Sequence, residues 1–421
     1  MTTANMQDGA VILRFMTIAI SHISAARYWL SYGLPDVPRL LDKSACSDSS
    51  PLQSGTEGRS ASGIGAQIDS AGLTSLRGML CSQSAKRLFD LSGCAVPSLE
   101  LIKEMRAQPF LRTEERLHLL VCGQPNRRKV KGVLCHSGDR PLPSGSVLTM
   151  RNGLRVCSPS LTFVQMGSLL PVPLLVCFGM ALCGIFAVES FVNPPECSFE
   201  HAELVPPQSN GLPARTQIMS VDKMARYLES APHLPGFRRA RTALQYVLER
   251  SRSPMESVSA LMLSMPRRAG GFGLPKPTLN CRVALDSWLH GGVSDRSANL
   301  RGALPFAESD MVFSYGDIAV HVDYHGKDYH AGESDLHHDS LKANAYAQKR
   351  IPYFILTKQQ VSNLALFEKF ALQLADSLGW KPRRVIANQA QRRAALHRIL
   401  LKGISVDDLI AVAESKRRKR G

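Results

Sequence analysis

The sequence lacks any pair of cysteines spaced C-x-x-C, although it contains ten cysteines. This absence excludes the usual ligand pattern of a zinc ribbon. Most of the cysteines lie among apolar residues, as in LLVCFGMALCG, where a free thiol behaves as a small hydrophobic side chain. The first thirty residues also lack the basic start and the clean apolar stretch of a secretory signal. We therefore expect a reducing, cytoplasmic location.

Charged residues are absent from Leu161 to Val188, so this stretch must be weighed as a membrane span. It contains Pro171 and Pro173, and only 15 residues separate Pro173 from Glu189. A membrane-spanning helix needs about 20 apolar residues. We expect two buried helices that are broken at the PVP sequence, and no membrane as a partner.

The overall composition is that of a globular protein, with 421 residues of which 44% are hydrophobic. This length allows two or three domains. Lysine and arginine number 51 against 35 acidic residues, which gives a net charge of +16. The excess favours a polyanionic partner such as nucleic acid or an anionic membrane surface, with simple solubility as the alternative.

The chain contains no internal repeats, and its patterns predict a multi-domain α+β protein. A helical segment is expected at the N-terminus, followed by a Ser/Gly-rich linker. Short strand-like pieces and apolar helices come next, then an alternation of helices and strands, and finally basic helices. The corresponding ranges are 1–43, 44–75, 76–214, 215–361 and 362–421.

The segment AVHVDYHG places His321, Asp323 and His325 on one face of a predicted strand. The preceding segment SDMVF completes a hairpin if the loop has an even number of residues, for instance Tyr315 and Gly316. In that register Asp310 pairs with His321, and Asp323 lies one diagonal step away, about 7–8 Å. The two carboxylates would then share one face.

Two carboxylates this close can share one hard cation, because Mg²⁺ prefers oxygen ligands and keeps several waters. Phosphodiester cleavage uses such an ion to polarise the phosphoryl group and to activate water. We expect Asp310 and Asp323 to hold Mg²⁺ or Mn²⁺. The expected acid–base and phosphate-contacting residues near them are His325, His330, Lys327 and Lys342. For Lys342, an exposed position on a solvated helix face is the alternative.

Glu256 is a candidate for a third metal-binding and catalytic carboxylate, at the start of a predicted helix. The same residue completes the capping-box pattern of Ser253, Pro254 and Glu256, so a capping role is the alternative. Five histidines fall between positions 321 and 338, which raises a structural zinc site as a further alternative. Their spacing does not match two ligands one helical turn apart, which disfavours zinc.

An ordered set of motifs resembles the domain of very-short-patch-repair-like endonucleases. The motifs are SPMES, GLPKP, ESDMVF, VHVDYHGKDYH and RIPYFILT, and they cover about residues 215–361. The resemblance implies the restriction-endonuclease-like, PD-(D/E)xK fold, an α/β/α core around a mixed sheet. The N-terminal part, with SHISAARYWL and RPLPSGSV, resembles that of actinobacterial abortive-infection type IV antitoxins.

The sequence departs from the endonuclease pattern at two positions. Asp323 stands where the family has Glu, and His325 stands where it has a second acid. A degenerate, inactive nuclease is therefore an open alternative.

We expect a metal-dependent DNA endonuclease-like protein that hydrolyses phosphodiester bonds. The rival hypothesis is a non-catalytic DNA-binding regulator or antitoxin with a cognate toxin. In it, contacts come from residues 1–43 or 76–158, and 76–214 is the regulatory or DNA-contact region. The basic residues expected to contact phosphates in the C-terminal helices are Arg383, Arg384, Arg392 and Arg393.

Overall fold

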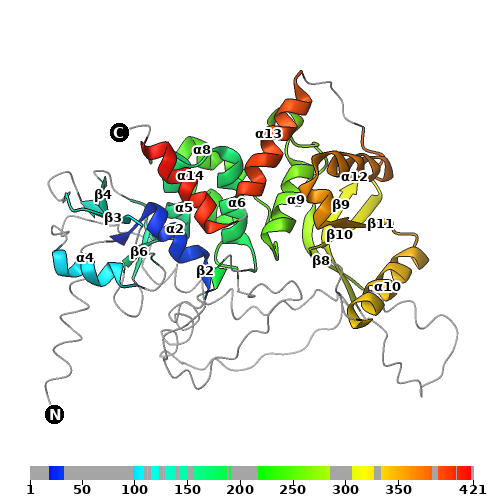
Figure 1. The fold of residues 1–421 in the computed structure, drawn as a ribbon, viewed down its shortest axis with the longest axis horizontal. Helices are drawn as coiled ribbons and strands as arrows, with labels where there is room; N and C mark the ends of the chain where they lie inside the picture. Colours follow the sequence, from blue (N-terminus) through cyan, green and yellow to red (C-terminus); the bar gives the residue numbers. More distant parts are fainter. Residues whose placement is uncertain are drawn as a thin grey trace, which may run out of the picture. The chain divides into compact units, whose positions relative to one another are not determined.

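A computed structural model describes the fold of the chain (Figure 1). The described residues are 19–32, 98–186, 189–190, 217–284, 306–326, 333–381, 387–403 and 405–418, with short gaps at 109–110, 112–114, 123–126, 128, 139–141 and 150–154. The predicted linker at 44–75 lies outside them.

The chain divides into two compact units. The first comprises Met1–Tyr28 and Gly33–Thr162, and the second comprises Trp29–Tyr32 and Phe163–Gly421. This division falls earlier in the chain than the boundary at 214/215 that the sequence suggested. The reason is the packing of the apolar helices, because α6 (Val172–Cys183) contacts α9 (Pro254–Ser264) and α13 (Gln389–Lys402).

The first unit is built on a mixed five-stranded sheet in the order β4-β3-β1-β6-β5. Its strands are β1 (Ala19–Ile20), β3 (Leu117–Cys122), β4 (Val133–Gly138), β5 (Val147–Thr149) and β6 (Arg155–Cys157), and its helices include α2 (His22–Leu30) and α4 (Leu99–Arg106). A strand-containing unit was predicted within 76–158, and this is confirmed. The sheet also takes in β1 from the N-terminal segment, which was expected to be helical only.

Three histidines gather where α2 meets this sheet. The ring of His22 stacks on that of His136 with centroids 3.5 Å apart, and Nε2 of His136 lies 3.0 Å from Nδ1 of His118. His118 is fully buried, and its backbone N–H donates to Ser24. These contacts help to fix the first helix on β3 and β4.

The uncharged stretch forms two helices, α5 (Pro159–Leu169) and α6, as predicted from the PVP sequence. Helix α6 begins after Pro171, and its residues from Leu174 to Cys183 are all buried. Among the described residues, no helix is long and apolar enough to cross a membrane. The prediction of two buried helices is therefore confirmed.

The second unit contains a four-stranded sheet in the order β11-β10-β9-β8. Its strands are β8 (Thr278–Ala284), β9 (Phe306–Tyr315), β10 (Ile318–His325) and β11 (Tyr353–Thr357). The pairs β8–β9 and β9–β10 are antiparallel, whereas β10 and β11 are parallel and are connected through α10 (Glu333–Gln348). The predicted helix–strand–strand–helix–strand order is present, with β8 as an additional strand.

Helices contact both faces of this sheet. On one face, Phe354 of β11 packs edge-on against Phe370 of α12 (Leu364–Ser377), with ring centroids 6.1 Å apart. On the other face, Tyr353 stacks on Tyr346 of α10, with centroids 4.9 Å apart and planes at 7°. Successive residues of a strand point to opposite faces, which is why neighbours 353 and 354 meet different helices.

The remaining helices of the second unit flank these layers. They are α7 (Val221–Ser230), α8 (Phe237–Leu244), α11 (Lys358–Ser362), α13 and α14 (Val406–Arg418), together with a short 3₁₀ turn, η2 (Arg267–Ala269), and a minor ladder of β2 (Ser31–Tyr32) with β7 (Glu189–Ser190). The predicted helical C-terminus is confirmed over its described residues. Helices and strands in both units make this a mixed α and β protein.

Candidate active site

The β9–β10 hairpin turns at Gly316 and Asp317, because Tyr315 pairs with Ile318. Gly316 has φ of 58°, the left-handed conformation that a tight hairpin turn requires and glycine adopts without strain. The predicted turn at Tyr315 and Gly316 was therefore wrong by one residue, although its even length was right. As a result the expected pairing of Asp310 with His321 was also wrong, since His321 pairs with Val312.

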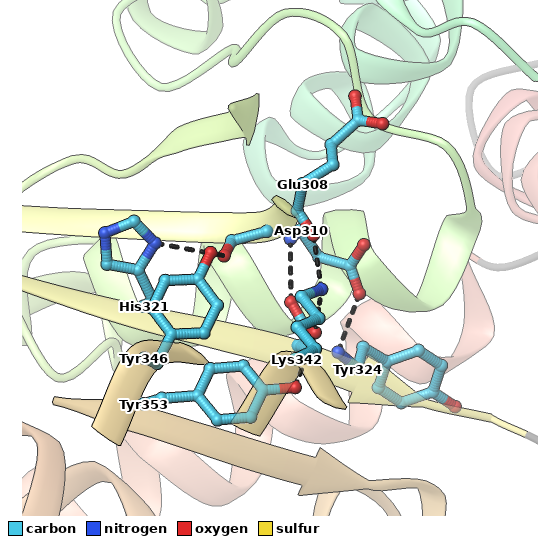
Figure 2. A network of polar contacts seen from close by, with 9 residues as sticks. Glu308, Asp310, His321, Tyr324, Lys342, Tyr346 and Tyr353 are labelled. Carbon is cyan, nitrogen blue, oxygen red and sulfur yellow. Dashed lines mark hydrogen bonds and ion pairs between the residues drawn. The ribbon is translucent and has the colours of Figure 1, made fainter. Parts of the chain in front are cut away.

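The last paired residues of the β9–β10 ladder are Met311 and Val322, and the next residues along the two strands are Asp310 and Asp323. Beyond this point, aspartate carboxylates accept hydrogen bonds from the backbone N–H groups of the opposite strand. The N–H of Asp310 donates to Oδ1 of Asp323 at 3.2 Å, and the N–H of Tyr324 donates to Oδ2 of Asp310 at 2.7 Å (Figure 2). The two acidic side chains thus meet where the strands part.

The second oxygen of Asp323 receives two further donors. The hydroxyl of Tyr353 donates to Oδ2 at 2.6 Å, and Nζ of Lys342 forms an ion pair with the same atom. Nζ also donates to the backbone carbonyl of Glu308. Lys342 is only 9% exposed. The alternative prediction, that Lys342 lies exposed on a solvated helix face, is therefore wrong.

Glu256 lies in the first turn of α9. Its backbone takes part in the helix cap, and its carboxylate is buried. The hydroxyl of Ser253 accepts from the N–H of Glu256 at 3.1 Å, which is the forward half of a capping box. The Glu256 carboxylate accepts from the N–H of Arg252 at 2.8 Å and from the amide of Asn280 at 3.2 Å. The acid is therefore buried between α9 and β8, and the charge of Asp310 acts on it.

Burial, and after it the crowding of acids, raises the pKa values of Glu256 and Asp310. Burial raises the pKa of Glu256 to about 8, and the charge of Asp310 adds to the effect. Burial likewise raises the pKa of Asp310 to about 6, with Asp323 as the next cause. Both groups are therefore harder to ionise than in water, and a nearby cation would favour their charged forms.

A layer of polar side chains lies beside Asp323 on the face of the sheet that α10 covers. The hydroxyl of Ser309 is 3.0 Å from Nδ1 of His321 and 2.7 Å from the hydroxyl of Tyr346 (Figure 2). Burial lowers the pKa of His321, which favours its neutral form. This layer attaches α10, the helix that carries Lys342, to β9 and β10.

The other sequence-predicted residues are distributed differently. His325 is half-buried at the end of β10 and pairs in register with Thr357. Arg392 is exposed and donates to the carbonyl of Arg268 at 3.1 Å. Arg393 pairs with Glu368 at 2.8 Å and stacks over Phe272, so its guanidinium serves intramolecular contacts. Outside the described residues lie His330, Lys327, Arg383 and Arg384.

Within the part of the chain that the structure describes, no three His, Cys, Asp or Glu side chains are arranged to hold an ion as they stand. Both Asp323 oxygens already accept hydrogen bonds, from the Asp310 N–H, the Tyr353 hydroxyl and Lys342, which agrees with this finding. Comparisons with models of protein families, with curated proteins and with solved structures return no match to this chain. The function must therefore be argued from the site itself.

Proposed function

We propose that the protein is a metal-dependent endonuclease-like hydrolase of phosphodiester bonds in DNA, with a restriction-endonuclease-like core in its second unit. The observation that carries this proposal is the meeting of Asp310 and Asp323 at the parting of two antiparallel strands. Lys342 from α10 touches one of these acids, and the charge of the other, Asp310, raises the pKa of Glu256 from α9. A fold alone does not determine activity, so the proposal depends on this constellation.

The chemistry of the donor set fits a hard divalent ion. Asp310, Asp323 and Glu256 supply carboxylate oxygens, which Mg²⁺ and Mn²⁺ prefer over nitrogen or sulfur. The Asn280 amide that donates to Glu256 also has a buried Oδ1 that accepts no hydrogen bond from any described residue. The raised pKa values of Glu256 and Asp310 point the same way, since a cation offsets the cost of burying and crowding their charged forms.

In this proposal the three acids hold the ion, which when bound withdraws charge from the scissile phosphate and acidifies water. His325, two residues beyond Asp323, exchanges a proton with the attacking water or the leaving group, and His330 is its alternative. Lys327 and Lys342 contact phosphate oxygens. Outside the acidic site, exposed Arg392 and the residues Arg383 and Arg384 add sequence-independent affinity for DNA.

One test is the nicking of supercoiled plasmid with Mg²⁺ or Mn²⁺. Wild-type protein should convert the plasmid to the open-circular form, and Asp310→Asn should not, because the variant removes a charged ligand without changing its size. The matched control is Asp317→Asn, an exposed acid in the turn of the same hairpin. Cleavage that persists in Asp310→Asn, or that chelation leaves unchanged, contradicts the proposal.

The second candidate is a non-catalytic DNA-binding regulator or antitoxin-like protein on the same scaffold. The observation that favours it is the occupation of both Asp323 oxygens by groups of the protein itself, together with the net charge of +16. DNA retention that falls with added salt, without nicking under either metal, would support this candidate over the first.

A further inference from the structure

Lys342 lies inside the acidic site. Its Nζ atom is held by Oδ2 of Asp323 and by the backbone carbonyl of Glu308, and it lies 5.8 Å from the ring centroid of Tyr353. Figure 2 shows the contact of the ammonium with Glu308, and the charge of Lys342 acts to lower the pKa of Asp310. Helix α10 thus places a positive charge directly on one of the two acids.

The helix is anchored so that this charge stays in place. Tyr346, one helical turn after Lys342, is fully buried, and its hydroxyl lies 2.7 Å from Ser309. Residues four apart in a helix lie on the same face, so the anchor and the lysine approach the sheet together. The docking of α10 therefore sets where the ammonium is held.

The two partners of the ammonium are a carboxylate oxygen and a backbone carbonyl. These are the hard oxygen ligands that Mg²⁺ and Mn²⁺ also take. A buried oxygen cannot bind both cations at short range without strong repulsion, because little water screens the two charges. Lysine has a flexible stem with a compact charge at its end, so the ammonium can leave while the helix remains docked.

We propose that Lys342 is an internal cation that competes with the divalent ion for Asp323, so that metal binds only as the ammonium moves off this carboxylate. The inference rests on the proposed function, because it takes Asp310 and Asp323 to be metal ligands. It adds a regulatory element to the site. Any partner or substrate that draws Lys342 away would raise the affinity for metal.

The first experiment measures Mn²⁺ binding to the full chain at neutral pH, using the electron paramagnetic resonance signal of free Mn²⁺. Lys342→Met removes the charge and keeps an unbranched side chain only one atom shorter, and we expect it to bind Mn²⁺ about tenfold more tightly or better. The matched control is Lys349→Met, which removes the same charge from the position just after α10 and should leave the affinity within about twofold. Asp310→Asn should lose the ion.

The outcomes separate this inference from the proposed function. If wild type binds Mn²⁺ through Asp310 but Lys342→Met binds it equally or more weakly, the competition is wrong and the metal site stands. If neither wild type nor Lys342→Met binds Mn²⁺, or if Asp310→Asn binds it as well as wild type, both are overturned. Binding by Lys342→Met alone supports the competition in its strongest form.

A second measurement uses only wild-type protein, so it does not depend on the folding of a variant. Reductive methylation of lysines is followed by mass spectrometry with and without saturating Mg²⁺. We expect the methylation rate of Lys342 to rise about threefold or more when Mg²⁺ displaces it, since a released ammonium becomes accessible. Lys349 in the same peptide map is the internal reference. An unchanged ratio of the two rates would overturn the inference.

Discussion

The backbone N–H of Asp310 donates to the carboxylate of Asp323 at 3.2 Å, immediately beyond the last paired residues of β9 and β10. In return, the Asp310 carboxylate accepts from the N–H of Tyr324 at 2.7 Å. Each acid therefore satisfies a backbone donor of the opposite strand that the ladder leaves unpaired. The positions of both side chains follow from the backbone, which is the kind of rigid support that a functional site needs.

The first prediction concerns the pH dependence of stability. The pKa of Glu256 is raised from 4.5 to about 8, so the folded state keeps a proton that the unfolded state releases. Stability is then greatest below the unfolded pKa and falls as pH rises towards the folded pKa. Glu256→Gln cannot ionise, so we expect it to match wild type at about pH 4 and to be more stable at about pH 8.5.

Urea unfolding of both proteins across this range measures the effect, read as the difference between them because Asp310 titrates in both. The control is Glu229→Gln, which makes the same substitution at an exposed position on α7. A Glu256→Gln variant that is less stable than wild type at the alkaline end would show that Glu256 is ionised and stabilising in the folded protein.

The second prediction concerns the hydroxyl of Tyr353, which donates to Oδ2 of Asp323 at 2.6 Å. Tyr353→Phe removes this bond and keeps the ring stacked on Tyr346. A hydrogen bond to a charged group contributes about 1.5–3 kcal/mol, so the free energy of unfolding should fall by about that amount. Chemical denaturation at neutral pH gives the value.

Tyr315→Phe is the matched control for this change. Tyr315 lies beside the exposed hairpin turn and is 42% exposed, so loss of its hydroxyl should alter stability by about 0.5 kcal/mol or less. If Tyr353→Phe costs no more than this control, Lys342 alone satisfies that oxygen of Asp323.

Local patterns in the sequence were sufficient to predict several features of the site region. Alternation in AVHVDYHG indicated a strand, and β10 covers most of this segment. The break at PVP and the cap at Ser253 follow from backbone chemistry that acts over a few residues. Such features depend on neighbours in the chain, and for this reason sequence alone can reveal them.

The remaining features depend on contacts between distant segments. The hairpin register was missed because Gly316 fits either of two adjacent two-residue turns, and a shift of the turn changes every pair. The pairing of Lys342 with Asp323 spans 19 positions and depends on how α10 docks. Tyr353 reaches Asp323 only because β11 pairs in parallel with β10, and β8 brings Asn280 to Glu256.

The last prediction concerns the core beneath the site. Phe370 of α12 is 2% exposed and packs against Phe354 of β11, the neighbour of Tyr353. Phe370→Ala leaves a cavity and should cost about 3–5 kcal/mol in urea unfolding. The same change should speed amide hydrogen exchange in β11, because the strand loses its support on this face.

Leu372→Ala on the same helix is the control, since Leu372 is 62% exposed and should change stability by about 0.5 kcal/mol or less. Equal effects of the two variants would contradict the packing of α12 on the sheet, and with it the rigid placement of Tyr353 beside Asp323.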